Sequence, residues 1–181
     1  MQKDAEGNAV DAGDNYLQIE GDVSTATPYY GSNGTINVGL NTADSYLKGH
    51  FYGVGNNNLY LRNGAVWDNM PAVTHNWAGG TYSTNNIVSN ISNLYGGADS
   101  AHAGNIYQQE SKDINIQNLS GYVNAYLGHE IGEDGNANFD ALGNIVVEKA
   151  TKTDGKNACI TLFTDRNGIC LLYTSPSPRD A

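Results

Sequence analysis

Residues 98–102 bring an aspartate, a serine and a histidine into one short segment, and these are the three residue types of a hydrolytic triad. An activated serine normally lies in a glycine-bracketed turn, yet the chain contains neither a Gly-x-Ser-x-Gly nor a Gly-Asp-Ser sequence. Three triad members on one loop also do not normally converge on a shared reacting atom. We therefore expect Asp99, Ser100 and His102 to form a non-catalytic polar loop beside Gly96 and Gly97.

The histidines and the cysteine outside the C-terminal tail do not form a metal-binding pattern. No histidine has another histidine or a cysteine at ligand spacing, and we expect all four at solvated strand or loop positions: His50, His75, His102 and His129. Cys159 has no histidine close to it in sequence and is followed by apolar residues, so we interpret it as a small apolar residue on a strand. The sequence predicts no cofactor.

Calcium is the best of the metal candidates. Oxygen-bearing side chains alternate along one segment, as in the first half of an EF-hand loop: Asp134, Asn136, Asn138 and Asp140. The pattern then fails, because Phe139 stands where the tight-turn glycine is needed and Ile145 where the bidentate glutamate belongs. We interpret the segment as a turn rich in Asx residues, and the sequence predicts no metal site.

Composition excludes two classes of partner. The 181 residues carry a formal net charge of −10, with a pI near 4.5, so nucleic acid and anionic lipid surfaces are repelled. Only 15% of residues are charged although the mean hydropathy is −0.46, because uncharged Asn, Ser, Thr, Gln and Tyr supply most of the polarity. No apolar run approaches the length of a membrane-spanning helix, so we expect no direct membrane insertion of this segment.

The elements that must position any site are short strands. Apolar and polar residues alternate in eight runs that glycine, asparagine and aspartate separate: residues 16–20, 35–40, 46–51, 58–62, 113–117, 122–127, 144–148 and 159–163. The separators, such as Asn63 and Gly64, hold the residues that enter positive-φ conformations at least cost, so each one predicts a sharp corner. Helical patterns are almost absent.

This pattern predicts an all-β fold, specifically a fragment of a right-handed parallel β-helix. In such a solenoid, asparagines can form ladders while aliphatic side chains fill a narrow interior, with about 20 to 25 residues per coil. The register cannot be assigned from the sequence. A β-sandwich is the alternative, since pairs such as Asn63 and Gly64 are also a strong antiparallel hairpin signal, and hairpins that project from a coil would combine both arrangements.

A family resemblance becomes specific at residues 58–69, which read NLYLRNGAVWDN. This segment resembles the recurrent strand and turn of pertactin-like autotransporter passengers, and residues 93–108, 114–121 and 143–150 are similar to repeat segments of the same group. The resemblance covers roughly residues 34–169. It implies a β-helical passenger, exported through its own C-terminal outer-membrane β-barrel and displayed on the surface of a Gram-negative bacterium.

The two ends of the chain are expected to be irregular. Residues 1–7 contain no apolar signal-peptide region, so we expect Met1 to be an internal or artificial start and residues 1–33 to form a partial coil or ragged end. Residues 170–180, from Cys170 to Asp180, resemble the conceptual translation of a sequencing adaptor. We therefore expect residues 34–169 to be the passenger segment and residues 170–181 to be non-native, with a genuine Pro/Ser-rich linker as the alternative.

The expected function is a non-catalytic stalk or adhesin segment, with a host glycan or surface protein as a possible partner. The twelve tyrosines and two tryptophans can stack on sugar rings, or they can form ladders along the solenoid. The alternative functions are a polysaccharide-degrading lyase or glycosidase and a carbohydrate-binding solenoid of phage type. The acidic patch of His129, Glu130, Glu133 and Asp134 contributes to an enzyme only if another coil places a second carboxylate opposite it.

Overall fold

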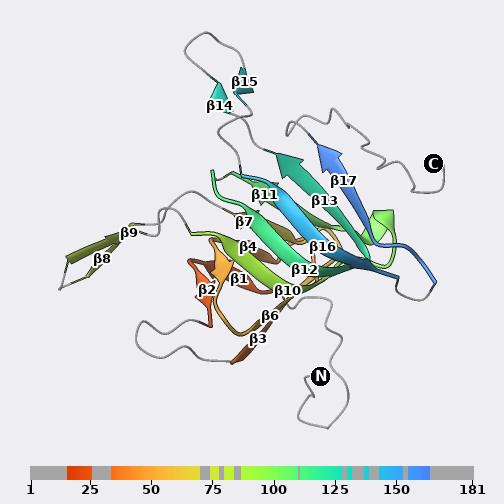
Figure 1. Ribbon diagram of the computed structural model, residues 1–181, viewed down its shortest axis with the longest axis horizontal. Coiled ribbons are helices and arrows are strands. Elements are labelled where there is room, and N and C mark those ends of the chain that lie inside the picture. The colour runs from red at the N-terminus through yellow and green to blue at the C-terminus, as the bar shows by residue number, and fades with distance from the viewer. Residues whose placement is uncertain are drawn as a thin grey trace.

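The protein is all-β, and most of its strand pairs are parallel (Figure 1). The computed structural model describes residues 16–25, 34–69, 74–77, 80–83, 87–109, 111–127, 130–131, 137–138, 143–152 and 155–163. The adaptor-like segment, Cys170 to Asp180, lies outside these residues.

Two large parallel sheets carry most of the strands. Sheet I contains, in spatial order, β1 (Gln18–Glu20), β4 (Tyr46–Lys48), β7 (Val66–Asn69), β11 (Gly104–Gln108), β13 (Tyr122–Leu127) and β17 (Cys159–Phe163). Sheet II contains β3 (Thr35–Leu40), β6 (Asn56–Leu61), β10 (Ser89–Tyr95), β12 (Ile114–Ser120) and β16 (Ile145–Thr151). A β-sandwich of the kind considered as the alternative consists of antiparallel sheets, whereas the strands of sheet I and sheet II pair in parallel.

Smaller elements complete the structure. The strands β2 (Val23–Ser24) and β5 (Phe51–Tyr52) form a short parallel pair, and η2 (Ser100–His102) is a single 3₁₀ turn. Two antiparallel hairpins are formed by β8 (Thr74–Trp77) with β9 (Gly80–Ser83), and by β14 (Glu130–Ile131) with β15 (Ala137–Asn138). Parallel sheets and hairpins therefore coexist, as the sequence allowed.

The chain runs alternately through the two sheets. We call one strand of sheet II together with the next strand of sheet I a pass, and each pass places its two strands beside those of the pass before it. Where the connections are short, the repeat is about 20 residues, since Thr35 lies opposite Asn56 and Tyr46 lies opposite Val66. The offset is longer where a hairpin is inserted. The β8–β9 hairpin lies in the chain between Val66 and its partner Asn105. The number of residues per repeat therefore varies along the chain, although the strands stay in register.

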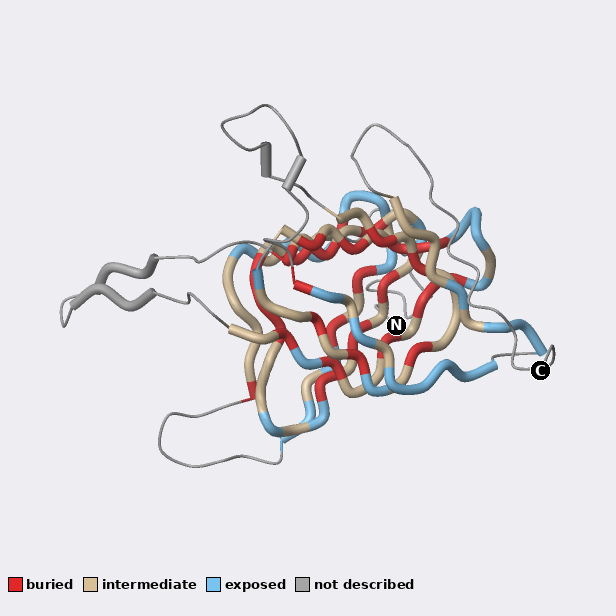
Figure 2. Tube along the Cα trace, turned by 45° about the horizontal axis from the view of Figure 1, so that its top comes forward, coloured by how far each residue is buried: buried red, intermediate tan, exposed pale blue. Residues whose placement is uncertain are grey.

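All eight predicted strand runs contain strands, and their alternation decides which side chains are buried. In β6, Asn57, Leu59 and Leu61 are buried, whereas Asn58 and Tyr60 are half-buried on the opposite face. The register stacks equivalent positions of successive strands, as in the column Val38, Leu59, Leu94 and Leu119 of sheet II and the column Leu47, Trp67, Ile106 and Ala125 of sheet I. These columns form one hydrophobic core between the sheets (Figure 2).

A chain of buried polar side chains crosses this core. The Ser89 hydroxyl donates to Asn69 Oδ1 at 2.7 Å, and Asn69 Nδ2 donates to Gln108 Oε1 at 2.7 Å. Gln108 Nε2 donates to the carbonyl oxygens of Lys112 and Gly143, at 2.7 and 3.2 Å. Because each of these three fully buried side chains has a hydrogen-bond partner, their burial avoids most of the desolvation penalty.

Asparagine and aromatic ladders follow the outer faces of the sheets. Asn58 Nδ2 donates to Asn37 Oδ1 at 2.9 Å, and Asn93 Nδ2 donates to Asn58 Oδ1 at 2.8 Å. On sheet I, Tyr107, Tyr126 and Phe163 form a continuous stack with 4.6 Å between ring centroids. The laddering expected from the asparagine-rich composition and the stacking of tyrosines are both confirmed.

Candidate functional site

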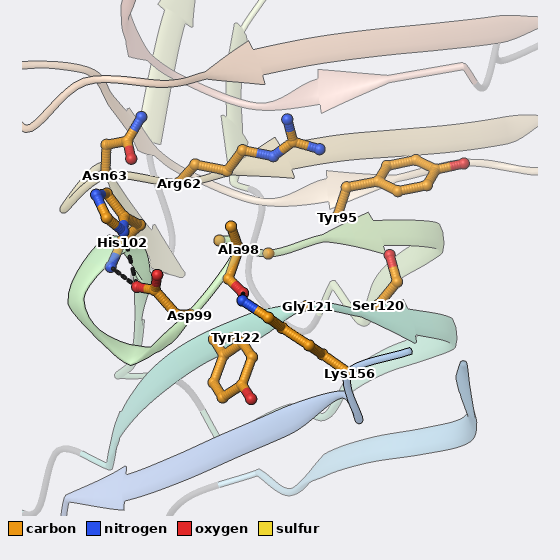
Figure 3. Close-up of a pocket in the computed structure, with 12 residues that line it drawn as sticks. Arg62, Asn63, Tyr95, Ala98, Asp99, His102, Ser120, Gly121, Tyr122 and Lys156 are labelled. Atoms are coloured by element: carbon orange, nitrogen blue, oxygen red, sulfur yellow. Dashed lines mark hydrogen bonds and ion pairs between the residues drawn. The ribbon is translucent and has the colours of Figure 1, made fainter. Parts of the chain in front are cut away.

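A cleft of about 550 Å³ opens where successive passes turn from sheet II to sheet I. Its walls come from four parts of the chain: the corner after β6, the segment from the end of β10 to η2, the β12–β13 corner, and the turn before β17. The side chains that line it combine aromatic rings, two cations and an Asp–His pair: Arg62, Asn63, Tyr95, Asp99, His102, Tyr122 and Lys156 (Figure 3).

Glycine produces the hollow. Gly96 and Gly97 follow β10, and Gly121 occupies the tight corner between β12 and β13, with a φ of 77°. A Cβ on Gly96 would lie 2.5 Å from the carbonyl oxygen of Tyr122, so the backbones approach too closely for any larger residue. Gly97 and Tyr122 exchange backbone hydrogen bonds of 2.9 and 3.0 Å. Three glycines therefore line the cleft at a point where the backbones of neighbouring strands approach closely.

Asp99 and His102 form a hydrogen-bonded pair at one end of the cleft. The Asp99 carboxylate caps η2, since its Oδ1 accepts hydrogen bonds from the backbone N–H groups of Ala101 and His102 at 3.0 and 3.1 Å. The same oxygen lies 2.7 Å from His102 Nδ1, and this hydrogen bond holds the pKa of Asp99 below its ordinary value. The side chains of His102 and Asp99 remain 59% and 44% exposed.

This geometry matches the predicted polar loop beside Gly96 and Gly97, but the Asp–His pairing and its place in a cleft are new. Ser100 begins η2 and is not among the residues that line the cleft. The capping bonds account for the position of Asp99 without a catalytic role, because a short turn needs an acceptor for its free N–H groups. Asp99 is the one carboxylate among the described residues that line the cleft.

Two cations line the cleft, and no carboxylate of the described residues forms an ion pair with either of them. Lys156, which precedes β17, donates from its Nζ to the carbonyl oxygen of Ala98 at 3.3 Å. The guanidinium carbon of Arg62 lies 5.3 Å from the centroid of the Tyr60 ring, a cation–π contact. Arg62 Nε is buried and has no hydrogen-bond partner in the part of the chain that the structure describes.

The expectation that all histidines are solvated is wrong for His50. Its side chain is 0% exposed, and its Nδ1 lies 2.8 Å from Asp22 Oδ1, which also accepts from the His50 backbone N–H at 2.9 Å. His50 stands at the corner between β4 and β5, after Gly49 with a φ of 146°, and the corner turns the ring inward. The partner carboxylate comes from another pass, which local sequence spacing does not reveal.

The remaining predicted residues have separate positions. His75 lies on β8, opposite Tyr82, whereas His129 lies outside the described residues. Of the calcium candidate, only Ala137 and Asn138 are described, as β15. Cys159 begins β17, which confirms its strand position, but it is exposed and therefore does not pack as an apolar residue.

A second hollow of about 480 Å³ lies on sheet II, and the described residues that line it contribute no aromatic ring and no cation. Its side chains are mainly amides and a carboxylate, including Asn90, Asn115, Gln117 and Glu148. Within the described ranges, no three His, Cys, Asp or Glu side chains are grouped closely enough to hold a metal ion. The same part of the chain contains no helix long and apolar enough to cross a membrane.

Comparison with protein-family models, with curated proteins and with solved structures finds no match to this chain.

Proposed function

We propose that this chain is a segment of a right-handed parallel β-helix that serves as a non-catalytic stalk or adhesin segment of an autotransporter-type passenger on the bacterial surface. The observation that carries the proposal is the alternation of the chain between two parallel sheets, with each pass stacked beside the previous one. A segment built in this way lengthens by repetition and can hold a binding surface at a distance from its anchor.

The ladders support a role as a rigid spacer. Each rung of the Asn37, Asn58 and Asn93 ladder bonds to the neighbouring pass, and the Tyr107, Tyr126 and Phe163 stack does the same on the other sheet. Such contacts join neighbouring passes along the whole stack, so bending requires many of them to break together. The net charge of −10 favours a soluble, extended surface over self-association.

The cleft supports binding over catalysis. Glycoside hydrolysis generally requires two carboxyl groups about 5 to 9.5 Å apart, one of them free to transfer a proton. Among the described residues of the cleft, Asp99 is the one carboxylate, and its Oδ1 accepts from two backbone N–H groups and from His102. A polysaccharide-cleaving activity is therefore the less supported alternative, and release of reducing ends from a polysaccharide panel would overturn the non-catalytic proposal.

Surface display is testable by placing residues 16–163 between a secretion signal and an outer-membrane β-barrel translocator. We expect the segment to reach the cell surface and to resist added protease as a folded unit. The Leu59→Asp variant places a charge at a fully buried position and should be degraded, whereas Asn58→Asp, on the opposite face of the same strand, should resist. Retention of the wild-type segment inside the cell, or equal degradation of all three proteins, contradicts the proposal.

A further inference from the structure

The aromatic ladder on sheet II ends inside the cleft. Tyr60 and Tyr95 stack with 4.6 Å between ring centroids and 16° between ring planes. The register places Ser120 next to Tyr95 on the following strand, and Thr151 next to Ser120. Tyr60 covers one face of the Tyr95 ring. On the following strand the position beside Tyr95 holds Ser120, whose side chain is too small to continue the stack (Figure 3).

On sheet I an aromatic stack continues across three neighbouring strands. There the equivalent column has three rings in succession, Tyr107, Tyr126 and Phe163, with the same 4.6 Å spacing. On sheet II the third rung is absent, and both Tyr95 and Ser120 line the cleft at that point. A flat apolar ring face is thus exposed beside backbone and side-chain hydrogen-bonding groups, an arrangement that suits the apolar face of a pyranose ring.

The charges around this position specify the ligand further. Arg62 and Lys156 line the cleft, and neither forms an ion pair with a carboxylate of the described residues. Asp99, the one carboxylate among the described lining residues, is already engaged by His102 and by backbone N–H groups. Arg62 Nε is a buried donor for which the described residues supply no acceptor. The chain as a whole has nine Lys and Arg residues against nineteen Asp and Glu, so a cleft with two unpaired cations stands out against an acidic protein.

We propose that this cleft binds a pyranose that carries a carboxylate, with the sugar ring stacked on Tyr95 as the missing rung of the ladder. The carboxylate is held by Arg62, through charge-assisted hydrogen bonds, and by Lys156. The proposal deepens the adhesin function proposed above, since it assigns that function a ligand class, but it concerns the isolated segment and does not depend on surface display. Failure of the display experiment therefore does not contradict the ligand proposal, and failure to bind the ligand does not contradict surface display.

The test is a titration of the purified protein, residues 1–181, followed by ¹⁵N chemical shifts, with three probes. Methyl β-D-glucuronide and the methyl glycoside of N-acetylneuraminic acid are carboxylated pyranoses, and methyl β-D-glucoside is the neutral control. A ligand of this size is expected to bind with a Kd on the order of 1 mM. Saturable binding of either carboxylated probe at least about 10-fold tighter than the glucoside supports the proposal and identifies which kind of acidic sugar is recognised.

Two variants separate loss of the site from loss of the fold. Ser120→Tyr supplies the third ring of the stack, so the protein should retain or raise its thermal midpoint while binding falls below detection. Arg62→Gln keeps a polar side chain and should weaken binding by about 10-fold or more while leaving the neutral glucoside unaffected. Gln117→Tyr, an exposed position on the same strand but outside this cleft, is the matched control and should bind as the wild type does.

The proposal is overturned by the absence of a saturable shift with both carboxylated probes up to about fifty times the expected Kd, or if neither carboxylated probe binds more tightly than the glucoside. Unchanged binding in a folded Ser120→Tyr protein likewise overturns it. Shifts confined to the amide-lined hollow near Asn90 and Asn115 would also overturn it, because they would place the ligand at the other site.

Discussion

Replacement of Asn69 by alanine should destabilise the protein more than its size suggests. The fully buried amide is the middle member of the polar chain in the core, where it accepts from the Ser89 hydroxyl and donates to Gln108 Oε1, both at 2.7 Å. The variant loses two hydrogen bonds, each worth about 1 kcal/mol net. It also leaves Gln108 Oε1 buried without its donor, which costs about a further 1 to 3 kcal/mol.

The expected loss is therefore about 3 to 5 kcal/mol in the free energy of unfolding. The matched control is Asn58→Ala, which removes a rung of the outer asparagine ladder, where both neighbouring amides reach water and the loss should stay below about 1 kcal/mol. Urea unfolding followed by circular dichroism measures both, with the slope m compared between variants. Hydrogen exchange of the β7 and β11 amides shows whether the damage is local.

The reasoning is refuted if Asn69→Ala and Asn58→Ala have the same midpoint, because burial would then make no difference to the cost of an unpaired amide. A larger loss for Asn69→Asp than for Asn69→Ala is a further expectation, since that change buries a charge at a site with no cation among the contacts described.

Three further outcomes follow from the structure. Trp67→Phe removes the hydrogen bond from the indole Nε1 to the Gly49 carbonyl oxygen, which lies 3.0 Å away in the core. Urea unfolding should show a loss of about 2 to 4 kcal/mol in the free energy of unfolding, and an unchanged value would show that the bond contributes nothing. Gly121→Ala puts a side chain on a residue with a φ of 77° and places its Cβ 2.6 Å from the carbonyl oxygen of Gly97 in the preceding pass. The thermal midpoint of this variant should fall clearly, and an unchanged midpoint would contradict the close approach of the two backbones. The pKa of Glu20 is held below its ordinary value of 4.5 by the hydrogen bond from Lys48 and, less strongly, by the hydrogen bond from Tyr46, so the stabilisation from the Lys48 pair is present above pH 4.5 and is lost as the pH falls through the lowered value. A ¹³C titration of the carboxyl should have a midpoint below 4.5 that rises toward the ordinary value in Lys48→Met, and an unchanged midpoint in that variant would contradict the assignment.

Three strands of the two large sheets that the alternating pattern missed, β7, β10 and β11, share one property. The alternating pattern identified β3, β6, β12, β13, β16 and β17, whose inward positions are almost all apolar. In β7, β10 and β11, an inward position holds Asn69, Ser89 or Gln108. These are the three side chains that satisfy one another in the core, so the hydrogen-bonding that makes their burial possible is also what conceals their strands from a hydrophobic pattern.

Local sequence also determined the sharp corners and the ladders. Asn63 and Gly64 both adopt positive φ, at 54° and 79°, as their residue types predicted. The asparagines on outward strand positions stack because equivalent positions of parallel strands lie side by side. These features depend on backbone preferences and on a period of two, and both are properties of short segments.

Tertiary structure alone decided the register and the cleft. Inserted hairpins make the spacing between stacked strands irregular, so the sequence does not show that Ser120 falls beside Tyr95, or that Arg62 and Lys156 face the same hollow. The same is true of the buried His50 and its partner Asp22. Contacts between passes depend on which residues the register places side by side. The register is set by how the shared core packs over the whole chain, so no single segment determines it.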